Sequence, residues 1–172
     1  MDEEIIDELM KKHNAILLRI AYYYTKNLHT AEDIVQDVFI KYFQKKRSLQ
    51  GDAVEKYLMK MTVNKAKDHL KSWHYQKLRF QEKWFAGKKV MPVDQLVLQD
   101  EEDMISAAIF SLPVKQREVI AYYYLEGFNA KQVAQLLNIP DSTVKSRLVK
   151  GRNELKQKLE MVEWEVLKNE PL

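Results

Sequence analysis

Glycine and proline are scarce in this chain, with four of each among 172 residues. Almost every long stretch between them repeats apolar residues at intervals of three or four positions, which is the spacing of one side of an α-helix. No stretch alternates polar and apolar residues as a half-buried strand does. The sequence therefore predicts an all-α fold, and 46% hydrophobic residues are enough to bury a core.

The first part of the chain predicts a domain of three helices over residues 1–75. The helices are expected over about residues 3–26, 30–45 and 52–73. The starts of the second and third helices have the spacing of capping boxes, formed by Thr30 with Asp33 and by Asp52 with Glu55.

The helical periodicity fails between residues 76 and 103. A basic and aromatic stretch there gives way to Pro92 and then to the acidic residues 100–103. We interpret this segment as a flexible linker that has room for a short helix. A second helical domain follows over residues 104–172, so two small helical domains on a tether are expected.

Residues 129–158 have the pattern of a helix-turn-helix. Asn129 is placed to cap a short helix, and Gln132 stands where a reciprocal side chain completes the capping box. Pro140 then disfavours a continuing helix, and Asp141 or Ser142 can cap the helix that follows.

The helix after this turn has two different sides. Its core side carries Val144, Leu148, Leu155 and Leu159, and its outer side carries Ser142, Lys145, Ser146, Val149 and Lys150. Residues 141–158 hold six basic and two acidic residues, a net charge of +4, although the whole chain has only +3. Because the early turns of a recognition helix reach base edges while Lys and Arg hold phosphates, we interpret the outer side as DNA-binding and assign phosphates to Arg147 and Arg152. The alternative is an ordinary surface helix with a solvated charged side.

Other classes of function find no support in the sequence. With no cysteine, neither disulfides nor thiolate metal sites are possible, and the four histidines lack metal-ligand spacing, so no metal or cofactor is expected. No catalytic signature is present, so the chain is not expected to be an enzyme. The acidic N-terminus and the lack of a long apolar run predict a cytoplasmic protein that does not insert into a membrane.

Two groups of motifs resemble the extracytoplasmic-function (ECF) sigma factors of bacterial RNA polymerase. The second domain carries Leu112-Pro113, Gln116-Arg117-Glu118, Gly127-Phe128, Val133-Ala134 and Thr143 to Leu148. The first domain carries Ala31-Glu32-Asp33, Gln36-Asp37-Val38-Phe39, Asn64, Asp68 and Lys71. The order of the two groups and the linker between them also match, so that the resemblance covers nearly the whole chain.

The resemblance implies a factor that joins the RNA polymerase core, recognises promoter DNA, helps to melt it and starts transcription, typically in a stress response. The outer side of the recognition helix would read the -35 element, with Arg147 and Arg152 supporting the DNA backbone. Asp33, Gln36 and Asp37 would dock on the polymerase core. The -10 element would be read by Asn64 and by a loop that holds a flipped base, made of Lys46, Arg47, Ser48, Leu49, Gln50, Gly51, Asp52 and Ala53.

Aromatic residues beside that loop have two possible roles. Tyr57, Trp73 and Tyr75 could stack on unpaired bases, although aromatic residues at helical spacing more often belong to a core. The sequence departs from the family pattern at Tyr57, where tryptophan is common, at Lys71, where arginine is common, and at Gly151, where alanine is usual. Glycine at position 151 lowers helix propensity by up to about 1 kcal/mol relative to alanine.

The resemblance also implies an anti-sigma factor as a partner, often one anchored in a membrane. The main alternative is a dimeric helix-turn-helix regulator that binds an operator without polymerase. A protein-interaction module that never meets DNA is a third possibility, in which Lys145 and Lys150 would be dispensable.

Overall fold

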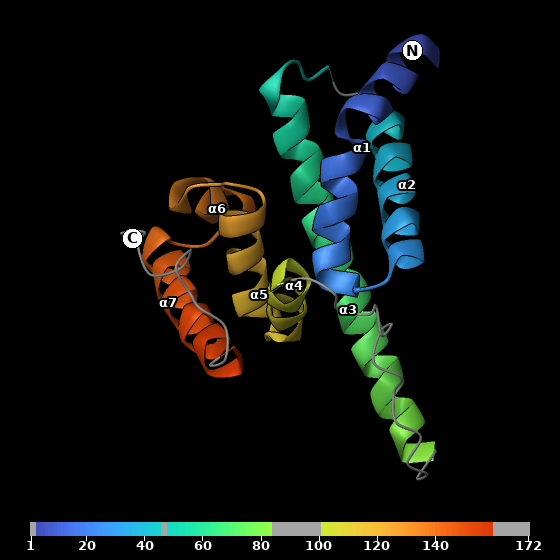
Figure 1. Ribbon diagram of the computed structural model, residues 1–172. Helices are drawn as coiled ribbons and strands as arrows, with labels where there is room; N and C mark the ends of the chain where they lie inside the picture. Colours follow the sequence, from blue (N-terminus) through green and yellow to red (C-terminus); the bar gives the residue numbers. More distant parts are fainter. Residues whose placement is uncertain (1–2, 46–47, 84–100, 160–172) are drawn as a thin grey trace. The chain divides into compact units, whose positions relative to one another are not determined.

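The structure is a computed structural model that describes residues 3–45, 48–83 and 101–159. It contains α1 (Glu3–Thr25), α2 (Leu28–Gln44), α3 (Asp52–Lys83), α4 (Glu101–Ser111), α5 (Val114–Ile120), the π-helix η1 (Ala121–Leu125), α6 (Ala130–Leu137) and α7 (Asp141–Lys158) (Figure 1). The chain divides into two compact units, with α1–α3 in the first and α4–α7 in the second. The prediction of an all-α chain with two helical domains is confirmed.

The three helices of the first unit pack against one another in every pairing. Their inner sides carry apolar residues at three- and four-residue intervals, as amphipathic helices around one core must. The buried positions include Leu17, Ile20, Ala21 and Tyr24 of α1, Val35, Val38, Phe39 and Tyr42 of α2, and Leu58, Val63 and Ala66 of α3. This core leaves the outer sides of α2 and α3 free to carry polar groups.

The start of α2 differs from the sequence prediction. α1 ends at Thr25, Lys26 takes a left-handed backbone with a φ of 54°, and Asn27 becomes the N-cap of α2. The Oδ1 atom of Asn27 accepts a hydrogen bond of 2.9 Å from the backbone N–H of Thr30. The predicted cap at Thr30 with Asp33 is therefore wrong, because Thr30 already lies in the first helical turn and its amide is taken by Asn27.

α3 extends to Lys83, past the end that the hydrophobic pattern predicts near residue 73. Residues 76–83 lack an apolar stripe but contain neither glycine nor proline, so the helix propagates through them without a new nucleation step. At 1.5 Å per residue α3 is about 48 Å long, and Figure 1 shows it continuing beyond the ends of α1 and α2. Of the rest of the predicted linker, residues 84–100 lie outside the described residues, and residues 101–103 belong to the start of α4.

In the second unit, α5 packs on α4 and α7, and α6 packs on α7. α5 continues directly into η1, and the wider turn of η1 contains three consecutive tyrosines, Tyr122 to Tyr124. Gly127, with a φ of 71°, follows the end of η1, and the ring of Phe128 stacks on that of Tyr122. The core of this unit includes Ile109, Leu112, Val119, Ile120, Val133, Val144, Leu148 and Leu155.

The helix-turn-helix is formed by α6, a short turn and α7. Both bonds of the predicted capping box are present: the Asn129 side chain accepts from the Gln132 amide at 2.8 Å, and the Gln132 side chain accepts from the Asn129 amide at 2.9 Å. α6 ends at Leu137, and its C-cap Asn138 adopts the left-handed conformation with a φ of 53°. Asparagine tolerates this conformation better than most residues, so the chain turns there without a glycine.

The cap of α7 is not the one predicted. Asp141 is already helical and Pro140 occupies the N-cap position, where no side-chain hydrogen bond caps the helix. The carbonyl of Pro140 instead accepts from the amides of Thr143 and Val144, at 3.0 and 3.2 Å. The expectation that Asp141 or Ser142 would be the cap is wrong, although the Asp141 carboxylate lies in the first turn, where the helix dipole favours a negative charge.

The position of the α2 cap can be tested by stability. We expect Asn27→Ala to lower the free energy of unfolding of the first unit by about 1 kcal/mol, because an orphan amide loses its acceptor. Thr30→Ala should change it by less than about 0.5 kcal/mol, because the structure gives that side chain no capping role. Hydrogen exchange of the buried amides of α2, with those of α7 as an internal reference, measures both; a larger effect at Thr30 would contradict the observed cap.

Candidate nucleic-acid and partner interfaces

α7 sorts its residues by helical periodicity into a buried side and an open side. Val144, Leu148, Gly151 and Leu155 are buried in the second unit. Five of the seven residues predicted to read the -35 element are exposed on the open side: Ser142, Lys145, Ser146, Val149 and Lys150. They follow one another at the i, i+3, i+4, i+7 and i+8 positions of a single helix face. The structure thus brings these five together on one accessible surface, and 45% of the Val149 surface is exposed.

The two arginines predicted to contact phosphates, Arg147 and Arg152, are not on this open side, because both are half-buried and bonded to other parts of the second unit. The Nη1 atom of Arg147 is 3.4 Å from Oε1 of Glu118 on α5, and only 21% of the Arg147 side chain is exposed. The Nε–H of Arg152 donates a hydrogen bond to the hydroxyl of Tyr124 in η1. Both arginines therefore occupy the flank of α7 that faces α5 and η1.

α7 approaches α5 closely at Gly151. A Cβ atom added at Gly151 would lie 2.7 Å from Cγ1 and 3.0 Å from Cδ1 of Ile120. By helix propensity alone, glycine is unfavourable at this position. The packing accounts for its presence, because the missing side chain leaves room for Ile120.

The predicted -10 loop is described from residue 48 onward, and Lys46 and Arg47 lie outside the described residues. Ser48 and Gln50 are exposed and Leu49 is half-buried. Gly51 has a φ of 59° and no atom within 4 Å of the position where a Cβ would be. α3 begins at Asp52, so that Asp52 and Ala53, both exposed, belong to its first turn.

α3 carries Tyr57 and Asn64 on the same face as this loop end. The Tyr57 ring is half-buried and lies 6.0 Å, centroid to centroid, from that of Tyr42, whereas Asn64 is exposed. Trp73 and Tyr75 lie outside the part of α3 whose side chains are described. With Tyr57 and Asn64, three lysines complete a series at intervals of three and four residues along this face, namely Lys60, Lys67 and Lys71. The sequence interpretation missed Lys60 and Lys67, although the same spacing that placed the apolar residues would have found them.

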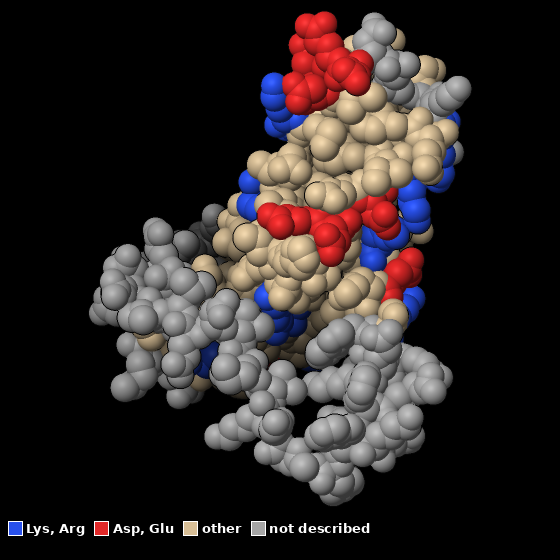
Figure 2. Space-filling view, turned by 90° about the vertical axis from the view of Figure 1, so that its right-hand side faces the viewer, with Lys and Arg blue, Asp and Glu red and all other residues tan. Residues whose placement is uncertain are grey.

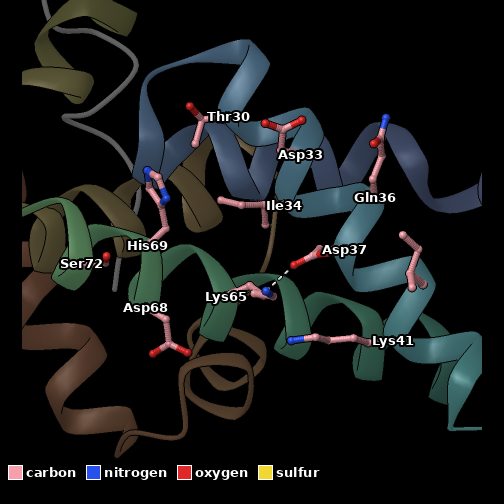
Figure 3. Close-up of a pocket in the computed structure, with 11 residues that line it drawn as sticks. Thr30, Asp33, Ile34, Gln36, Asp37, Lys41, Lys65, Asp68, His69 and Ser72 are labelled. Carbon is pink, nitrogen blue, oxygen red and sulfur yellow. Dashed lines mark hydrogen bonds and ion pairs between the residues drawn. The ribbon is translucent and has the colours of Figure 1, made fainter.

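A groove of about 720 Å³ runs between α2 and α3 and contains the predicted polymerase-binding residues. In Figure 3, Asp37 turns toward α3 and pairs with Lys65, whereas Asp33 and Gln36 extend away from α3. Figure 2 views the first unit from the side of α2 and shows a band of acidic side chains with basic ones directly beside it. The groove is lined by charges of both signs, and Asp33 and Gln36 on its α2 rim are exposed.

Three ionisable groups of this groove influence one another. The hydrogen bond from Lys65 holds the pKa of Asp37 below its ordinary value, and the same bond raises the pKa of Lys65. The nearby ammonium of Lys65 lowers the pKa of Lys41. Because 50% of the Asp37 side chain and 30% of that of Lys65 are exposed, solvent weakens this pair, and it serves more to orient Lys65 than to stabilise the fold.

Two other kinds of site were sought among the described residues. Residues 3–45, 48–72 and 104–159 contain no group of three histidine, aspartate or glutamate side chains that could hold a metal ion. None of the helices in the described ranges combines the length and apolar character that crossing a bilayer demands.

Comparison with known families assigns the two units. Residues 9–74 match the model of sigma-70 region 2, and residues 102–155 match that of sigma-70 region 4. The protein named "ECF RNA polymerase sigma factor SigE" of Mycolicibacterium smegmatis is 28% identical over 158 residues, which cover 89% of this chain. This chain belongs to the ECF sigma factors. The alternative of a dimeric helix-turn-helix regulator is not favoured, because it does not account for the region 2 match.

A further curated relative and a solved structure are also similar to this sigma factor. "Probable RNA polymerase sigma factor RfaY" of Xanthomonas campestris is 30% identical over 151 residues, or 82% of this chain. The chain spans only 38% of the length of that relative and 61% of that of the Mycolicibacterium protein. Among solved structures, the sigma factor RpoE in complex with the anti-sigma factor NepR from Bartonella quintana is similar with a TM-score of 0.69, 22% identity and coverage of 94% of this chain and 100% of that one. At this identity the structure supports the fold.

The Asp37–Lys65 pair predicts a pH effect with a definite sign. Because the pKa of Asp37 is lowered in the folded protein, the contribution of the pair to stability is present above the unfolded pKa and is lost as the pH falls through the folded pKa. We expect a carbon NMR titration to find the pKa of Asp37 below its ordinary value in the unchanged protein and higher in Lys65→Gln, because the hydrogen bond from Lys65 is the main cause of the lowering. Lys56→Gln, an exposed change on the same helix, is the control and should leave the Asp37 titration unmoved.

The packing at Gly151 predicts that alanine is destabilising there. We expect Gly151→Ala to lower the stability of the second unit by about 1–3 kcal/mol, because overpacking against Ile120 outweighs the gain in helix propensity. Asn153→Ala, at an exposed position of α7, should instead be neutral or slightly stabilising. Thermal unfolding of the full chain measures both, and equal gains at the two positions would show that α5 and α7 are not in close contact.

Proposed function

We propose that this sigma factor binds the RNA polymerase core in the cytoplasm and directs it to promoters with a -10 and a -35 element. The observation that carries the proposal is the presence of sigma-70 regions 2 and 4, in that order, in one chain, with exposed polar faces on both units. The chain itself makes no covalent bond. Its contribution is to position the polymerase and to hold promoter DNA in the open form.

The open side of α7 is proposed to read the -35 element. Lys145 and Lys150 offer donors to base edges, Ser146 can donate or accept, and Val149 offers an apolar contact to a thymine methyl group. The first turn of α7 also presents backbone N–H groups, which suit a phosphate. The five residues lie within about two turns, which matches the part of a recognition helix that enters the major groove.

The -10 element is proposed to be bound by the loop of residues 46–53 together with Asn64. Removing a base from its stack requires a few kcal/mol, which contacts in a fitted pocket must offset. Tyr57 is half-buried against Tyr42, so a stacking role would use only its exposed edge. Lys60, Lys67 and Lys71 on the same face would hold the phosphates of the separated strand.

The polymerase core is proposed to dock on α2 through Asp33, Gln36 and Asp37. Asp33 and Gln36 point outward, whereas Asp37 is engaged with Lys65. An anti-sigma factor is proposed to block these surfaces until a stress signal arrives. The solved complex of a related fold with an anti-sigma factor supports this part of the proposal.

Transcription with purified components tests the function. The full chain is mixed with core RNA polymerase and a promoter library randomised at both elements, and the transcribed templates are sequenced. We expect a stable complex with the core and RNA whose templates share two separated sequence elements. If no complex forms while a palindromic duplex is bound tightly by a dimer, the proposal is wrong and the operator-binding alternative is right.

Variants of α7 then test the proposed -35 contacts. Lys145→Ala and Lys150→Ala should each weaken recognition of the selected -35 sequence by about 1–3 kcal/mol, since each removes a base contact. Lys158→Ala makes the same charge change at the far end of α7 and should have little effect. Equal transcription by all three variants would show that this face does not read DNA.

A further inference from the structure

The contact between α5 and α7 contains an unusual number of buried polar groups. Gln116, Arg117 and Glu118 are consecutive and all buried, with exposed fractions of 8%, 6% and 2%. A carboxylate as enclosed as that of Glu118 requires a partner, because an unpaired buried charge is strongly destabilising. Arg147 of α7 approaches it, with 3.4 Å between Nη1 and Oε1.

A second link joins α7 to η1, the direct continuation of α5, through Arg152 and Tyr124. The Nε–H of Arg152 donates to the Tyr124 hydroxyl, and the guanidinium carbon lies 5.5 Å from the centroid of the Tyr124 ring. The Nη2 atom of Arg152 is buried and has no hydrogen-bond partner among the described residues. Nε and Nη2 of the guanidinium are thus turned into the protein, away from the open side of α7. Tyr124 stands within the π-turn of η1, a type of irregularity that is often found at functional sites.

These two links lie on either side of the close approach at Gly151. Arg147 is four residues before Gly151 and Arg152 is one residue after it, so the helix is held at two heights along its axis. A helix packed only by apolar side chains can still rotate a little about its own axis. Rotation by about 20° moves groups at an outer radius of about 6 Å by roughly 2 Å, which is enough to break hydrogen bonds to base edges.

We infer that Glu118 and Tyr124 are positioning residues of the DNA-reading helix. By holding Arg147 and Arg152 they fix the rotation of α7, and with it the direction in which Lys145, Ser146, Val149 and Lys150 point. This inference rests on the proposed function, in which α7 reads the -35 element. It reassigns Arg147 and Arg152 from contacts with DNA phosphates to anchors within the protein, and it leaves the phosphates to the lysines and to backbone N–H groups.

The test uses Tyr124→Phe, which keeps the ring and removes only the hydroxyl that binds Arg152. With the full chain, core polymerase and the promoter selected by the unchanged protein, we expect preference for the selected -35 sequence over a scrambled one to fall about 5-fold. Preference at the -10 element, the affinity for the core and the salt dependence of DNA binding should stay as they were, since no phosphate contact is lost. Tyr123→Phe removes a neighbouring hydroxyl as the matched control and should change nothing. Glu118→Gln should act like Tyr124→Phe, and the tyrosine variant keeps the test decisive if the buried glutamine prevents folding.

A double variant separates positioning from direct contact. If Tyr124 acts through Arg152, the pair Tyr124→Phe with Arg152→Ala should lose no more -35 preference than Arg152→Ala alone. Unchanged -35 preference in Tyr124→Phe, or full additivity in the double variant together with a smaller salt dependence in Arg152→Ala, overturns the inference and restores Arg152 as a phosphate contact. Absence of promoter-directed RNA with the unchanged protein is a different result, because it overturns the proposed function and the inference with it.

Discussion

The close approach of α7 to α5 at Gly151 is the contact on which the second unit depends. Because glycine has no side chain, Ile120 can fill the space beside the α7 backbone, and the two helices come near enough for Glu118 to meet Arg147. The same approach buries the apolar side of α7 and forces the opposite side into solvent. One packing contact therefore decides which residues of α7 are available for the proposed contact with DNA.

In the first unit, a charged pair rather than a glycine joins two neighbouring helices. α2 turns its apolar side toward α1 and α3, and its polar side then carries Asp33, Gln36 and Asp37. Of these, Asp37 is occupied by Lys65, which ties the partner-facing side of α2 to α3, next to the exposed Asn64. The proposed polymerase contact and the proposed -10 contact are thus connected through adjacent residues of α3.

Local signals in the sequence predicted some local features correctly and missed others. The capping box of Asn129 and Gln132 and the open side of α7 follow from spacing within a few residues, and both are present. The predicted cap at Thr30 is wrong because Asn27, three residues earlier, is the N-cap, and its side chain accepts a hydrogen bond from the backbone N–H of Thr30. α3 was predicted too short because helix propagation needs no apolar stripe, whereas the prediction relied on one. The partner of Arg147 could not be predicted, since Glu118 is 29 residues away and only the packing of α5 on α7 brings the two together.

The turn between α6 and α7 has a consequence for binding. Asn138 supplies the left-handed residue and the ring of Pro140 holds its own φ at −62°, so the folded connection reaches its shape without a glycine. Much of the ordering that α7 needs for the proposed contact with DNA is therefore complete before binding. Association then loses little additional chain entropy, and a modest number of contacts can yield a specific complex.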